Sequence, residues 1–131
     1  MPQNIAVQNV TDFINRTFGI ANIEIQHEQP FALTFGNDFT LMFDFYQDTT
    51  QLSILKQVSD YDTQASLLTL LELCHFDHHH AFTLQPGYLT DNILSICAHI
   101  PAEKLTLPEL NKYFDTLFTT LDTAITQGVA S

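Results

Sequence analysis

Residues 31–45, FALTFGNDFTLMFDF, form the clearest extended segment of the chain. Large apolar side chains occupy every second position on both sides of Gly36-Asn37-Asp38, which is the period of a strand with one buried face. A short Gly-Asn-Asp sequence between two such runs is typical of a hairpin turn. We therefore expect two antiparallel strands that are joined at residues 36–38.

The segments outside this hairpin continue with further strands and with helices. Turn sequences bound the extended runs, and apolar residues at spacings of three and four mark the first and last helices. The expected strands are 31–35, 39–46, 52–58, a fourth that starts at Phe82 and is turned by Pro86-Gly87, and 93–100. The expected helices are 5–18, ended by Gly19; about 62–73, capped by Asp62; and about 106–126, opened by the capping pair Thr106 and Glu109 and followed by Gly128.

The order of these elements is α-β-β-β-α-β-β-α. Because the strands follow one another across short turns, we expect an antiparallel sheet and the α+β class. The length of 131 residues suits one domain, and neither a linker nor a repeat divides residues 1–131.

The middle helix is apolar on nearly every side. Its five leucines between residues 67 and 73 are interrupted only by Thr69 and Glu72. A helix of this kind has to be buried on more than one side, which is difficult to arrange in a monomer of this length. A second chain is the simplest cover, so we expect a homodimer.

The composition excludes several classes of function. Four Lys and Arg against fifteen Asp and Glu give a formal net charge of −11, so the chain lacks the basic surface that binds nucleic acid or anionic membranes. No apolar run approaches the roughly 20 residues of a membrane-spanning helix, and the first residues have no basic and apolar leader regions. Two isolated cysteines fit a reduced protein. We expect an acidic cytoplasmic protein without a cofactor.

One segment, Cys74–His80 (CHFDHHH), gathers residue types that bind metals. Thiolate, imidazole and carboxylate groups bind zinc or nickel, but this spacing matches no established site. A solvated loop with Cys74 as a small buried residue is the simpler interpretation. The alternative that stays open is a metal-binding or metal-sensing protein that uses Cys74, His75, His78, His79 and His80.

No catalytic constellation is visible. Ser95 and His99 share one face of the predicted fifth strand, but no third residue orients the imidazole. The sequence contains neither a GxGxxG nor a Walker phosphate loop, and no carboxylate pair has a readable acid–base arrangement. We therefore do not expect an enzyme.

Four stretches carry a resemblance to a known family. They are Phe18-Gly19-Ile20, residues 82–87 (FTLQPG), residues 93–97 (ILSIC) and residues 100–110 (IPAEKLTLPEL), which an amphipathic helix follows. Together with the element order, the small size and the low pI, they resemble the class I type III secretion chaperones, the family of Tir and Yop effector chaperones. The resemblance implies their fold, a homodimer in the bacterial cytoplasm, and one effector or a few as partners.

The resemblance also implies how the effector is held. Its non-globular N-terminal segment wraps the dimer in extended form, with apolar side chains in grooves and partial strand addition, and the export ATPase is a further implied partner. The implied effector grooves involve the first helix and the first strands, here Phe13, Ile23, Ile25, Phe31, Leu33 and Phe35. The implied dimer contact involves the second helix and nearby strands, here Leu67, Leu70, Leu71, Leu94 and Ile96.

The residues themselves agree with a partner-binding sheet. A single layer of helices covers one face of a sheet and leaves the other face available. Met42 and Tyr46 alternate with Phe43, so they are expected on the free face and join the candidate effector-binding residues. Besides the metal-binding alternative, a dimeric adaptor of the same fold outside secretion is a second alternative.

Overall fold

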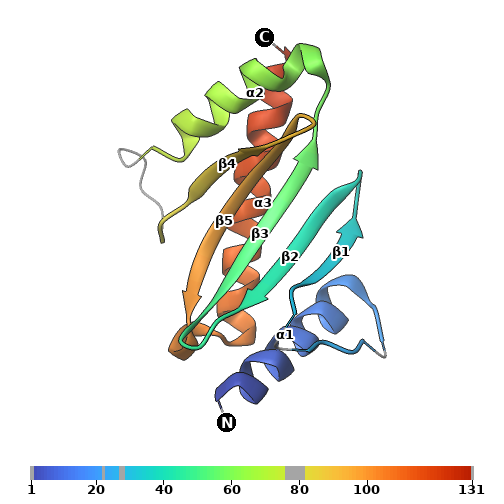
Figure 1. Cartoon of the computed structure of the whole chain (residues 1–131), viewed down its shortest axis with the longest axis vertical. Coiled ribbons are helices and arrows are strands. Elements are labelled where there is room, and N and C mark those ends of the chain that lie inside the picture. Colours follow the sequence, from blue (N-terminus) through green and yellow to red (C-terminus); the bar gives the residue numbers. More distant parts are fainter. Residues whose placement is uncertain (1, 22, 27–28, 76–81, 131) are drawn as a thin grey trace.

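The computed structural model describes residues 2–21, 23–26, 29–75 and 82–130, and it has the expected α+β architecture (Figure 1). The elements follow one another in the predicted order. They are α1 (Pro2–Phe18), β1 (Phe31–Phe35), β2 (Phe39–Phe45), β3 (Thr49–Gln57), α2 (Asp60–Leu73), β4 (Gln85–Leu89), β5 (Ile93–Pro101), the short 3-10 helix η1 (Ala102–Lys104) and α3 (Leu107–Ala130).

The five strands form one antiparallel sheet with the order β1-β2-β3-β5-β4. Leu41, Ile54 and Ile96 are register partners on adjacent strands, and none of the three has an exposed side chain. In Figure 1, α3 lies behind the sheet. The apolar residues at alternate positions therefore form one face of the sheet, and this face is turned toward the helices, as the sequence predicted.

Aromatic rings join α1 and α3 to this buried face. The Phe13 ring of α1 lies 6.2 Å from the Phe43 ring of β2 and 5.8 Å from the Phe114 ring of α3, measured between ring centroids. Both contacts are edge-to-face, which suits the charge distribution of aromatic rings. These rings fix where α1 sits against the sheet.

Three helix ends differ from the prediction. Helix α1 begins at Pro2 and not at Ile5. Helix α2 begins earlier than expected, because the Ser59 side chain accepts the hydrogen bond from the Asp62 backbone N–H and acts as the cap. Helix α3 runs through Gly128 to Ala130 instead of stopping near residue 126. Gly128 lies against Ser66 of α2, where an added Cβ would be 2.7 Å from the Ser66 backbone nitrogen. The glycine thus permits a close helix crossing and does not end the helix.

The third and fourth strands also differ from the prediction. β3 runs from Thr49 to Gln57 instead of 52–58. β4 starts at Gln85 and includes Pro86 and Gly87, which were expected to form its turn. β4 is an edge strand, and an edge position tolerates a proline that cannot donate a hydrogen bond. The turn lies at residues 90–92, where Asp91 and Asn92 adopt positive φ angles of 64° and 62°.

Helices α2 and α3 pack together at one end of the molecule. α2 packs chiefly on α3 and also contacts the edge strand β4. Its buried side chains are Thr63, Ser66 and Leu70, whereas Tyr61, Leu68 and Leu71 of the same helix are exposed. Across the described residues, no helix combines the length and the hydropathy that a bilayer crossing requires.

Candidate protein-binding surfaces

The face of the sheet that points away from the core is the first candidate surface, and we call it the open sheet face. Strand alternation and register place its residues, and most of them are half-buried or exposed. It consists of Ala32, Thr34, Thr40, Met42, Asp44, Gln51, Ser53, Leu55, Gln57, Gln85, Gly87, Leu89, Ile93, Ser95, Cys97 and His99.

Small side chains in the middle of this face project only a short distance from the strands. Gly87 of β4 lies beside Ser95 of β5, and an added Cβ at Gly87 would be 2.4 Å from the Ser95 hydroxyl oxygen. The neighbouring positions on β3 and β5 are Ser53 and Cys97, and the Cys97 thiol donates to the Gln85 side-chain oxygen at 3.4 Å. A partner can therefore approach the strands closely here.

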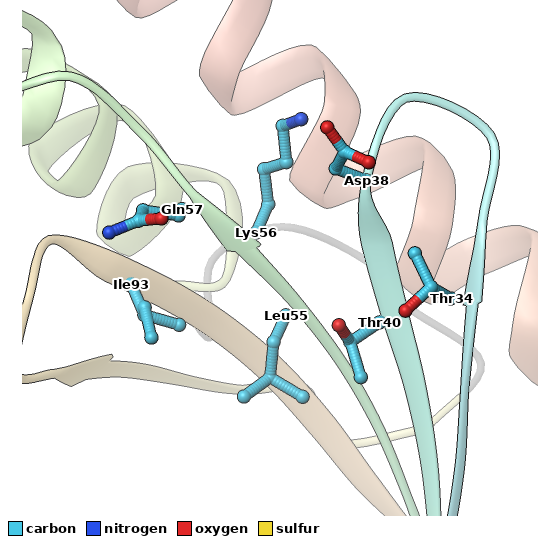
Figure 2. A pocket seen from close by; sticks show the side chains of 7 residues that line it. All are labelled: Thr34, Asp38, Thr40, Leu55, Lys56, Gln57 and Ile93. Carbon is cyan, nitrogen blue, oxygen red and sulfur yellow. The ribbon is translucent and has the colours of Figure 1, made fainter.

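A depression of about 470 Å³ lies at one end of the sheet (Figure 2). Lys56 alternates with Leu55 along β3, and Figure 2 shows the two side chains on opposite sides of the strand. The Lys56 ammonium group donates to the Asn37 carbonyl and lies 5.1 Å from the centre of the Phe39 ring. The lining residues are Thr34, Asp38, Thr40, Leu55, Lys56, Gln57 and Ile93.

The outer side of α2 is the second candidate surface. Tyr61, Leu68 and Leu71 are 97%, 58% and 46% exposed. With Gln64 they follow one another at spacings of three, four and three residues, which is the spacing of a helix-pairing seam. We call these four residues the α2 stripe. Large exposed apolar side chains grouped in this way are typical of a protein-binding surface.

Residues 8–125 match the family model of the type III secretory system chaperone SycN. The match covers most of the chain. The chain belongs to the SycN family of type III secretion chaperones. No curated protein sequence matches it significantly.

Solved structures have the fold of this SycN-family chain at low sequence identity. A chain of the ExsC–ExsE complex matches with a TM-score of 0.72 and 17% identity, over 94% of this chain and 92% of that one. A chain of the HopA1–SchA chaperone–effector complex matches with a TM-score of 0.66 and 16% identity, over 94% of both chains. YbjN from E. coli also matches, with a TM-score of 0.57 and 12% identity over 95% and 91%. Because the fold is also found in YbjN, it is the family match that decides against an adaptor outside secretion.

The predicted effector-binding residues are divided between core and surface. Phe13 is fully buried in the SycN-family chain, inside the ring cluster of α1, β2 and α3. Met42 is half-buried on the open sheet face, and Tyr46, 54% exposed, reaches the Gln51 side-chain oxygen at 3.5 Å. The others are half-buried against the core on β1 or in the segment before it, namely Ile23, Ile25, Phe31, Leu33 and Phe35.

The predicted dimer residues are divided in a similar way. Leu70, Leu94 and Ile96 have no exposed surface in the single chain, so they cannot touch a second molecule unless the fold rearranges. Leu67 is half-buried against the core, and Leu71 is exposed within the α2 stripe. The sequence prediction did not single out Leu68 and Tyr61, whose exposed side chains the spacing of the α2 stripe could have indicated.

The metal-binding alternative is not favoured. Burial raises the pKa of the Cys74 thiol to about 11, which disfavours the thiolate form. Residues 76–80 of the candidate segment lie outside the described part of the chain. Within the described part, no three His, Cys, Asp or Glu side chains are placed to hold a metal ion.

Proposed function

We propose that this SycN-family chain binds the non-globular N-terminal segment of an exported effector in the bacterial cytoplasm and keeps it soluble and ready for export. The observation that carries the proposal is the family match over residues 8–125. The likeness in fold to a chain of a chaperone–effector complex supports it. In this proposal the chain works by binding and masking apolar side chains, not by catalysis.

The proposal places the effector segment on exposed parts of the first helix and the sheet. Extended segments bind sheets through main-chain hydrogen bonds at an edge and through side chains in pockets. β1 is an edge strand, and Phe31, Leu33 and Phe35 are half-buried along it. Met42 and Tyr46 extend the candidate surface onto the open sheet face. Phe13 supports this region from within the core.

We also propose a homodimer that pairs through the α2 stripe. The stripe combines exposed apolar side chains with helix-pairing spacing, and the opposite side of the same helix is anchored on α3 by Ser66 and Leu70. Leu67 and Leu71 of the sequence prediction lie on α2, whereas Leu94 and Ile96 are buried in the core on β5. A further proposal, which rests on the family resemblance alone, is that the loaded dimer is presented to the export ATPase.

A gene deletion in the native bacterium tests the effector proposal. Removal of this gene should lower both the cellular amount and the export of one exported protein, or of a few, because an unmasked segment aggregates or is degraded. Other exported proteins should be unaffected, and the wild-type gene supplied in trans should restore the loss. Unchanged amounts and unchanged export of every exported protein would contradict the proposal.

A further inference from the structure

Every hairpin turn of the sheet carries an exposed aspartate. Asp38 lies between β1 and β2, Asp48 between β2 and β3, and Asp91 between β4 and β5. The register pairs Thr40 with Leu55 and Gln57 with Ile93, so the turns of Asp38 and Asp91 lie at the same end of the sheet. That end also contains the depression, which Asp38 helps to line. Asp48 marks the opposite end.

The open sheet face has no cation to balance these carboxylates. Asp44 is its one Asp or Glu, and none of its residues is Lys or Arg. The cation among the residues that line the depression is Lys56. Its ammonium group donates to the Asn37 carbonyl and lies near the Phe39 ring. The face therefore combines a floor of mostly small or uncharged side chains with an acidic border, which consists of Asp44 and the turn aspartates.

Charge decides which occupant suits this face. A second copy of the chain has the same net charge of −11 and would bring a second set of the same aspartates to the interface. Like charges at an interface oppose binding, whereas opposite charges favour and steer it. A partner that has both cationic and apolar or small side chains suits this face, because the cationic ones can meet the acidic border and the others can meet the floor.

We propose that the open sheet face binds a cationic amphipathic segment, with apolar or small side chains on the floor near Leu55 and Ile93 and Lys or Arg side chains at Asp38, Asp44 and Asp91. This inference rests on the proposed function, since the segment is that of the effector, and it adds the chemistry of the segment. The lysine and arginine stems lie along the strands while their charged ends reach the border.

Two synthetic peptides of equal length test the preference. Both have the same apolar residues at alternate positions; one has lysine at the intervening positions and the other has glutamate. In fluorescence anisotropy at about 50 mM NaCl, the Kd of the lysine peptide should be at least about tenfold lower, and the difference should shrink at about 500 mM NaCl. Equal affinities at low salt, or a difference that salt leaves unchanged, would overturn the proposal.

Matched charge variants locate the binding site. The surface variant combines Asp38→Asn, Asp44→Lys and Asp91→Asn, where Asn tolerates the positive φ of the two turn positions. The control variant combines Asp115→Lys and Asp122→Lys, two exposed positions on α3, and changes the net charge by the same amount. The surface variant should weaken binding of the lysine peptide about tenfold and the control less than about threefold.

The outcomes separate this inference from the proposed function. Equal losses in both variants would mean that only the overall charge attracts the peptide, and this would overturn the docking site. A change in oligomeric mass instead of peptide affinity in the surface variant would assign the face to a second copy and would also overturn it. Either result leaves the gene-deletion test of the effector proposal untouched. If the surface variant does not fold by circular dichroism, the milder pair Asp38→Asn and Asp91→Asn, compared with Asp115→Asn and Asp122→Asn, decides by the same criterion.

Discussion

Replacing Phe13 with alanine should destabilise the folded chain by about 3–5 kcal/mol. The side chain is fully buried, and its ring contacts Phe43 and Phe114, so the smaller residue leaves a cavity between α1, β2 and α3. Such a loss is a large part of the about 5–15 kcal/mol that stabilises a typical domain. Urea unfolding followed by circular dichroism measures it as a lower midpoint.

The matched control is Ile5→Ala on the same helix. Ile5 is 61% exposed, so its truncation should change the free energy of unfolding by only about 0.5 kcal/mol. The comparison separates a core role for Phe13 from the effector contact that the sequence predicted. If Phe13→Ala unfolds at the same urea concentration as the wild type but loses its partner protein, Phe13 is a contact residue and its placement in the core is wrong.

Replacing Leu68 with glutamate should dissociate the proposed homodimer without unfolding the chain. Leu68 is 58% exposed, so a glutamate there is solvated in the monomer but is buried without a partner when two α2 stripes pack together. Because an isologous interface contains each residue twice, the dimer dissociation constant should rise by about 100-fold or more. Light scattering coupled to size exclusion measures the mass at micromolar concentration.

Two further variants control this result. Ile5→Glu introduces the same charge at an equally exposed apolar position outside the α2 stripe, and it should leave the dimer intact. Leu70→Glu places the charge on the fully buried side of α2 and should unfold the chain. A Leu68→Glu variant that stays dimeric would show that the two copies pair through a surface other than the α2 stripe.

The fold was largely predictable, because local signals and tertiary packing agree in most elements. The alternation around Gly36-Asn37-Asp38 predicted β1, β2 and the buried sheet face. The errors occur where packing overrides a local signal. Pro86 and Gly87 have the composition of a turn, but an edge strand accommodates both, and Gly128 has the composition of a helix end, but a close approach to Ser66 requires it.

The candidate surfaces were less predictable than the fold. Apolar spacing identifies a residue that avoids water, but it does not say whether the same chain or another molecule covers it. Leu68 and Leu70 are both leucines of one helix, yet one is 58% exposed and the other fully buried. Similarly, Phe13 has the spacing of an amphipathic helix, and only the ring contacts with β2 and α3 place it in the core. The acidic border of the open sheet face depends on the strand register, which brings distant turns together.

Purification of the tagged chain from its native bacterium tests the central claim most directly. Mass spectrometry should identify one exported protein or a few in the purified complex. Limited proteolysis should leave an N-terminal segment of that protein protected, at a mass that corresponds to two copies of the chain for each segment. Recovery of a single unbound chain with no exported protein, or of an exported protein held only through a folded domain, would contradict the account.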